Sequence, residues 1–147
     1  MRERAGELRH VEALNRAARA LQHRDRSRAE LASRLDEAGV DAAARDSALE
    51  ALERAGIVDD RRLALNRAAS LAERGYGDSA IRFALEREAV AGELVEEALA
   101  ALEPEGERAR RLVEARGGGP KAARLLAARG FEAATVEEAL GRFADGE

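Results

Sequence analysis

The sequence predicts an all-α fold of three tandem three-helix repeats that form an elongated, slightly curved helical body. Of its 147 residues, 46% are hydrophobic and 37% are charged, but only 3% are aromatic. Ala, Leu, Glu and Arg therefore dominate, and all four favour helix. Apolar residues recur at spacings of three and four, as they do on one face of a helix. This pattern returns along the chain at fixed offsets, which indicates an internal repeat.

The first predicted repeat covers about residues 7–56. Ser27 and Glu30 form a capping box that starts its second helix, and Gly39 stops that helix. Asp41 is placed to cap the third helix. The side chains expected to face the core are Leu8, Val11, Leu14, Ala18 and Leu21, then Leu31 and Leu35, then Ala44, Ala48, Leu49 and Leu52.

The second predicted repeat covers about residues 57–103. Asp59 or Asp60 caps its first helix, and Gly75 ends it. The last helix stops before Pro104, because proline cannot continue a helix. The side chains expected to face the core are Leu63, Ala64, Ala68 and Leu71, then Ile81 and Leu85 with Phe83 or Ala84, then Leu94, Val95, Ala98, Leu99 and Leu102.

The third predicted repeat covers about residues 104–147 and has a flexible joint at residues 117–120. Pro120 suits the first turn of a helix, where its missing N–H costs nothing. The expected core is formed by Leu112, Val113, Ala122, Leu125, Leu126, Val136, Ala139, Leu140 and Phe143.

The repeats align without gaps over most of their length. An offset of 50 residues lays three apolar residues of the first helix on three of the fourth, namely Leu14, Ala18 and Leu21 on Ala64, Ala68 and Leu71. An offset of 41 lays the second repeat on the third, with Leu85, Val90 and Val95 on Leu126, Phe131 and Val136.

Composition excludes several classes of function. The chain has no cysteine, so it has neither disulfides nor a thiolate metal site. It has no apolar run that could span a bilayer and no signal-peptide core, so we expect a cytoplasmic protein with no membrane partner. The formal net charge is −4, but basic and acidic blocks alternate, which allows one basic face.

No enzymatic site is predicted. Asp59 and Asp60 are interpreted as helix-capping residues, and His10 and His23 as solvated surface residues. The glycine-rich joint lacks the Lys-Ser/Thr of a phosphate-binding loop. We therefore expect no catalytic residues, no metal and no cofactor.

Several short segments, in this order, are similar to those of the RecX regulatory proteins, bacterial modulators of the RecA recombinase. They are Arg26-Ser27-Arg28-Ala29-Glu30-Leu31, Gly56-Ile57-Val58-Asp59-Asp60, Arg74-Gly75-Tyr76-Gly77 and Gly130-Phe131. The resemblance covers roughly residues 10–144. It implies three tandem three-helix repeats without enzymatic chemistry. It also implies a protein that binds RecA, or the filament that RecA forms on DNA, and that inhibits or modulates the ATPase and strand-exchange activities of RecA. Through RecA, such a protein would regulate recombination, DNA repair and the SOS response.

The chain departs from that family after residue 77, where Asp78-Ser79-Ala80 replaces a proline and basic residues. The resemblance also implies weak direct DNA contact, since some members of the family bind DNA, but the missing basic residues argue against such contact by the second repeat. The alternative function is a nucleic-acid-binding helical repeat module that acts independently of RecA. We expect a monomer.

Arginines are the predicted partner contacts, since guanidinium groups bind carboxylates and phosphates. Tyr76, the sole tyrosine, is interpreted first as a packing residue of its turn and second as a contact. The candidate partner-binding residues are Arg24, Arg26, Arg28, Arg74, Tyr76, Arg82, Arg87, Lys121, Arg124 and Arg129.

Overall fold

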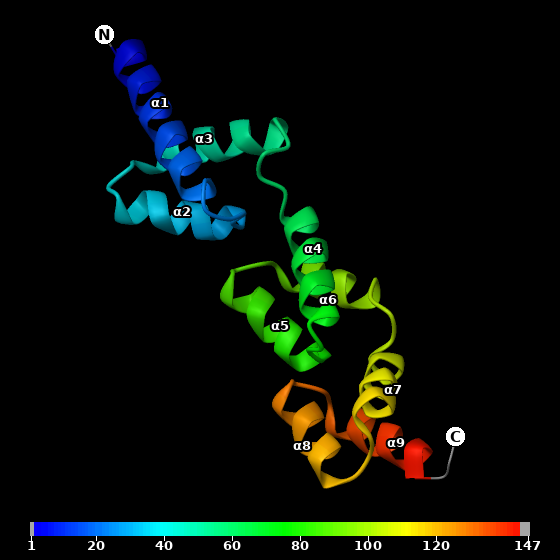
Figure 1. The fold of residues 1–147 in the computed structure, drawn as a ribbon. Helices are drawn as coiled ribbons and strands as arrows, with labels where there is room; N and C mark the ends of the chain where they lie inside the picture. The colour runs from blue at the N-terminus through cyan, green and yellow to red at the C-terminus, as the bar shows by residue number, and fades with distance from the viewer. Residues whose placement is uncertain (1, 145–147) are drawn as a thin grey trace. The chain divides into compact units, whose positions relative to one another are not determined.

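The computed structural model describes residues 2–144, and over this range the chain forms nine α-helices and no strand (Figure 1). The all-α prediction is confirmed. The helices are α1 (Arg2–Leu21), α2 (Arg28–Glu37), α3 (Ala42–Arg54), α4 (Asp60–Glu73), α5 (Asp78–Arg87), α6 (Gly92–Ala100), α7 (Glu105–Arg116), α8 (Pro120–Ala128) and α9 (Ala133–Ala144).

Side-chain caps begin three of these helices as the sequence predicts. Ser27, Asp41 and Asp59 each accept a hydrogen bond from the amide three residues later, at 3.1, 2.9 and 3.0 Å. Of the two aspartates proposed for α4, Asp59 is therefore the cap. Pro120 occupies the first turn of α8, also as predicted.

The second hydrogen bond of the predicted capping box, from the Ser27 amide to the Glu30 side chain, is not formed. The Oε1 atom of Glu30 accepts hydrogen bonds from Arg24 and Arg26 instead. Its other oxygen, Oε2, is buried without a hydrogen-bond partner. The guanidinium groups of Arg24 and Arg26 thus replace the Ser27 amide as hydrogen-bond donors to Glu30, because charge-assisted hydrogen bonds are stronger than those from a neutral amide.

The apolar face predicted for the first helix is wrong in its N-terminal half. Leu8 and Val11 are 67% and 50% exposed, whereas Ala13 and Ala17 are buried. Ala18, which was expected inside, is exposed. The sequence argument weighted the large side chains, but small alanines allow α1 to pack closely against α3.

The repeat offset in the first helix also needs correction. The buried pair Ala13 and Ala17 corresponds to the buried pair Ala64 and Ala68, which is an offset of 51 rather than 50. The segment between α1 and α2 therefore holds one extra residue, which shifted the predicted face of α1 by about 100°.

Two compact units divide the chain. Unit 1 extends to Leu63 and includes Glu88–Val90; unit 2 contains Ala64–Arg87 and the chain from Ala91 onward. The predicted repeat boundaries and the elongated, curved shape stay predictions. The core of unit 1 contains Ala17, Leu31, Leu35, Leu49, Leu52 and Val58. One core of unit 2 contains Ala109, Val113, Ala122, Leu126, Phe131, Val136 and Ala139.

Most other core predictions agree with the observed burial. Ile81, Leu85 and Val95 are buried in unit 2. Of the two residues proposed beside them, Ala84 is partly buried, whereas Phe83 is 62% exposed. The predicted core side chain of Phe143 lies outside the side chains that the structure describes. No helix in the described range is long and apolar enough to cross a membrane.

Candidate interaction surface

Tyr76 lies between two arginines in unit 2. The guanidinium carbons of Arg74 and Arg129 are 5.5 and 5.6 Å from the centre of its ring. Arg129 also donates a hydrogen bond from Nη1 to the Arg74 carbonyl at 2.7 Å. Cations over an aromatic face are attracted by the ring quadrupole. Three candidate residues, which together span 55 positions of the chain, thus form one basic cluster, and the role of Tyr76 in bracing its turn stays a prediction.

The backbone beneath this cluster joins the start of α5 to the end of α8. The Gly77 amide donates to the Arg129 carbonyl at 2.8 Å, and the Ser79 amide donates to the Gly130 carbonyl at 3.0 Å. A Cβ atom on Gly77 would lie 2.5 Å from the Phe131 nitrogen. Because no side chain fits there, glycine is required at position 77.

Arg108 is a buried residue that the sequence argument missed. It donates hydrogen bonds to the carbonyls of Glu103 (2.9 Å) and Tyr76 (3.0 Å), and it forms an ion pair with Asp78. Its side chain is 9% exposed. Its place four residues before Leu112, on the inward face of α7, could have indicated this role. Asp78, part of the departure from the RecX pattern, is thus a structural partner of Arg108.

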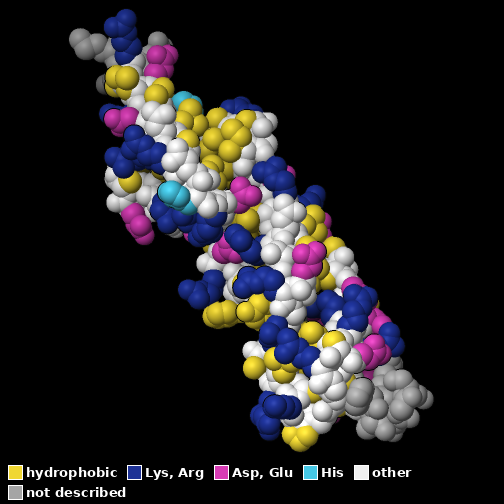
Figure 2. All heavy atoms as spheres, in the orientation of Figure 1, with side chains coloured by type: hydrophobic (Ala, Val, Ile, Leu, Met, Phe, Trp, Pro, Cys, Tyr) yellow, Lys and Arg dark blue, Asp and Glu magenta, His cyan; other side chains and the backbone are white. Residues whose placement is uncertain are grey.

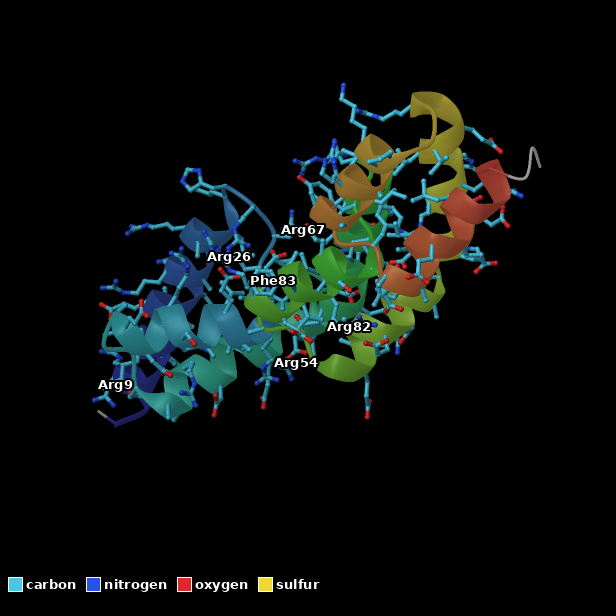
Figure 3. All side chains as sticks on the ribbon, turned by 90° about the horizontal axis from the view of Figure 1, so that it is seen from below. Arg9, Arg26, Arg54, Arg67, Arg82 and Phe83 are labelled. Carbon is cyan, nitrogen blue, oxygen red and sulfur yellow. The ribbon has the colours of Figure 1, made fainter. Side chains whose placement is uncertain are left out.

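Two other candidates, Arg82 and Arg87, lie on α5, which also carries the exposed Phe83; Figure 3 labels Arg82 and Phe83. Arg82 donates to Glu96 at 2.8 Å, and this bond lowers the pKa of the Glu96 carboxyl. Arg87 lies 5.8 Å from the centre of the Phe83 ring. The arginine and the exposed ring together form a cationic and apolar spot on α5.

A groove of about 590 Å³ lies beside the start of α8. Its cationic residues are Arg116, Lys121 and Arg124, and its apolar residues are Ala122 and Leu125. None of the three cations has an acidic partner among the described residues. Figure 2 shows Lys and Arg side chains over this helix. The sequence prediction included Lys121 and Arg124 but missed Arg116.

The three candidates of unit 1 are already bound to carboxylates. Arg24 pairs with Glu30 and Glu88, and Arg28 pairs with Glu53 at 2.6 Å. Arg26 is 9% exposed and donates from Nε to the Ala20 carbonyl at 2.8 Å (Figure 3). The guanidinium group of Arg26 therefore stabilises the segment between α1 and α2.

A second groove, of about 310 Å³, lies between α1 and α2 in unit 1. Its apolar lining includes Leu31 and Leu35. The exposed arginines around it are Arg16, Arg19 and Arg34, the His23 imidazole also lines it, and none of these four was among the predicted contacts. The sequence prediction missed these arginines because they come from two helices, α1 and α2, that meet only in the fold.

The described residues contain no group of acidic or histidine side chains that could hold a metal ion. Ser47 and His10 contact each other at 3.0 Å on the exposed surface, through Oγ and Nδ1. No carboxylate within the described range orients the imidazole, as an activated serine would need.

Comparison with known proteins identifies the family. Residues 13–52 match the family model for RecX, first three-helix domain. The chain is 35% identical over 136 residues to the regulatory protein RecX of Stenotrophomonas maltophilia (strain R551-3), covering 86% of this chain and 83% of that protein. The chain belongs to the RecX family. A second regulatory protein RecX, from Xanthomonas axonopodis pv. citri (strain 306), is 37% identical over 86% of this chain and 84% of its own.

Two crystal structures of RecX proteins have the same fold as this chain. RecX from Lactobacillus salivarius aligns with a TM-score of 0.78 at 15% identity, covering 92% of this chain and 97% of that one. Another regulatory protein RecX aligns with a TM-score of 0.72 at 18% identity, covering 93% and 73%. The fold class predicted from the sequence is therefore confirmed as that of the RecX proteins.

Proposed function

We propose that this chain regulates RecA by binding RecA or its nucleoprotein filament in the cytoplasm, and that it inhibits or modulates the recombinase and ATPase activities. One observation carries the proposal, namely the identity of 35–37% to regulatory RecX proteins over more than four fifths of their length. The regulation needs no chemistry from the chain itself, since binding one state of a partner is enough to shift its equilibrium.

The basic residues of unit 2 support this proposal. The cluster of Arg74, Tyr76 and Arg129 is held by the backbone bonds beneath it, so it is ordered before a partner arrives. A preorganised surface loses less conformational entropy on binding. Of the predicted contacts in unit 2, Arg87, Lys121 and Arg124 are also exposed. We propose all of these as partner contacts, together with Arg24, Arg28 and Arg82.

The test is ATP hydrolysis by the cognate RecA on single-stranded DNA, measured while this chain is titrated into the reaction. The proposal expects hydrolysis to fall at substoichiometric amounts, because one blocked site stops a whole run of filament. Hydrolysis that stays unchanged at equimolar chain would contradict the proposal.

A second candidate function is a nucleic-acid-binding module that acts without RecA. The cations of the groove beside α8, which have no acidic partner among residues 2–144, favour this alternative. Affinity for DNA should then fall steeply with salt, because phosphate contacts release counterions. Gel-shift titrations with single- and double-stranded DNA at low salt test it, and the absence of any shift would exclude it.

A further inference from the structure

The two basic grooves lie at corresponding places in two helix triplets. Leu31 lines the groove between α1 and α2, and Ala122 lines the groove beside α8. The sum of the two repeat offsets, 50 and 41, lays Leu31 on Ala122. Each groove is thus built on the same inner position of a second helix, once in unit 1 and once in unit 2.

Both grooves combine an apolar lining with exposed cations. In unit 1, Ala20 and Ala38 contribute accessible apolar surface above the buried Leu31 and Leu35, while Arg34 extends from α2. In unit 2, Ala122 and Leu125 contribute apolar surface while Arg124 lies between them in sequence. A partner that fits must therefore offer negative charge and an apolar group together, because either alone would leave half of the groove unmatched.

The cations of these grooves differ from several arginines elsewhere in the chain. Arg24, Arg28, Arg82 and Arg108 all pair with carboxylates. The groove residues Arg16, Arg19, Arg34, Arg116, Lys121 and Arg124 have no acidic partner within the described range. Exposed cations without partners raise the local positive potential, which attracts an anionic ligand and speeds its association.

A protein segment fits this chemistry better than a nucleic acid does. Among the described residues that line the two grooves, the only aromatic ring is the His23 imidazole, so the groove beside α8 offers bases no ring to stack on and the groove of unit 1 offers one. The net charge of −4 opposes the approach of a long polyanion. An acidic segment of a protein carries fewer charges and also supplies apolar side chains.

We infer that each groove receives an acidic segment of the protein partner, with an apolar side chain inserted between the helices and carboxylates bound to the surrounding cations. This inference rests on the proposed function, since it describes the surface that the regulated partner would present. Two grooves that combine the same kinds of side chain suit a partner that presents the same segment more than once, as the subunits of a filament do.

The test measures binding of a fluorescein-labelled peptide of alternating Glu and Leu to the full chain by anisotropy. Comparison peptides replace every Leu by Ser or every Glu by Arg, and oligothymidylate serves as the nucleic-acid probe. We expect the Glu/Leu peptide to bind, and both peptide changes to weaken binding about tenfold or more. Oligothymidylate should not displace the bound peptide.

The variants Arg34→Glu and Arg124→Glu each reverse one groove cation, and the double variant should lose peptide binding by more than tenfold. Arg54→Glu is the matched control (Figure 3). Both Arg34 and Arg54 are exposed residues in the last turn of their helices, so both reversals carry the same helix-dipole penalty. Arg54 lines neither groove and should keep full binding.

The outcomes separate this inference from the proposed function. The inference is wrong and the proposed function stands if the chain inhibits RecA but does not bind the peptide. The same holds if the double variant inhibits RecA as strongly as the unchanged chain does. If the peptide binds through the grooves but RecA hydrolysis is unaffected, the groove chemistry stands and the partner is not RecA. Displacement of the peptide by oligothymidylate would reassign the grooves to nucleic acid.

Discussion

The N-terminal ends of α2 and α5 occupy corresponding places in units 1 and 2, yet they are held differently. At α2, the Ser27 hydroxyl caps the helix and donates to the Glu88 carbonyl. At α5, the corresponding residue is Gly77, and its amide donates to the Arg129 carbonyl. An offset of 41 lays Glu88 on Arg129, so the accepting carbonyl is equivalent in both units.

A carboxylate supports both helix ends in the same way. Asp60 accepts a hydrogen bond from the Arg28 amide at 2.9 Å, and Glu105 accepts one from the Asp78 amide at 2.6 Å. Both units therefore keep the acceptor carbonyl and the supporting carboxylate. The hydrogen-bond donor differs, because it is the Ser27 hydroxyl in unit 1 and the Gly77 backbone amide in unit 2. That change brings the backbones of unit 2 close together and makes glycine obligatory there.

The largest expected effect is that of Gly77→Ala. The added Cβ would lie 2.5–2.6 Å from the backbone of Gly130 and Phe131, so the two segments must separate at a cost of about 3 kcal/mol. Urea unfolding followed by the fluorescence of Tyr76, the sole tyrosine in a chain without tryptophan, reports on this region. Gly106→Ala is the control, because a Cβ there meets nothing within 4 Å. Equal urea midpoints for Gly77→Ala and Gly106→Ala would contradict the close backbone approach assigned to Gly77.

Removing the carboxylates of Asp60 and Glu105 should lower the free energy of unfolding by less than Gly77→Ala does, and by unequal amounts. Glu105 accepts from two amides, those of Asp78 and Glu132, whereas Asp60 accepts from the Arg28 amide. We expect Glu105→Ala to lower the free energy of unfolding by about 2 kcal/mol and Asp60→Ala by about 1 kcal/mol. Urea unfolding followed by circular dichroism measures both. A larger loss for Asp60→Ala would mean that the two carboxylates do not have the equivalent role assigned to them.

Ser27→Ala tests the side-chain donor of unit 1. It removes the cap of α2 and the bond to the Glu88 carbonyl, and we expect a loss of about 1 kcal/mol. Amide hydrogen exchange in α2 should rise accordingly. Ser33→Ala, at an exposed position inside the same helix, is the control and should not raise exchange. Similar exchange in both variants would show that Ser27 does not hold the helix end.

The smallest expected effect is a gain in stability at Ala89. This exposed residue has a φ of 60°, whereas Gly39 and Gly130 occupy the equivalent places with φ of 83° and 82°. Ala89→Gly should raise the free energy of unfolding by about 1 kcal/mol, because glycine adopts this conformation without strain. Ala100→Gly, in an exposed helical position, should have the opposite sign. A loss of stability in both variants would contradict the strain assigned to Ala89.

Much of the fold could be predicted because local chemistry determines it. Capping by Ser27 and Asp41 and the proline at the start of α8 depend on neighbours within a few residues. The inner face of α1 could not be predicted as easily. An alanine packed at 0% exposure and one in solvent look alike in sequence, and the larger Leu8 and Val11 were misleading.

The candidate surface was less predictable, because it depends on which charges neutralise one another in the fold. Arg26 and Arg124 look equivalent in sequence, yet the first is buried against Ala20 and Glu30 and the second is exposed in a groove. The cluster around Tyr76 needs Arg129 from more than 50 residues away. Only an assembled fold brings such residues together.

We propose that this RecX-family chain binds RecA in its filament. The most direct measurement is co-sedimentation of the chain with cognate RecA filaments assembled on single-stranded DNA, beside the same DNA without RecA. The account predicts that the chain sediments with the filaments and stays in the supernatant with DNA alone. Equal sedimentation with bare DNA, or none with filaments, would contradict it.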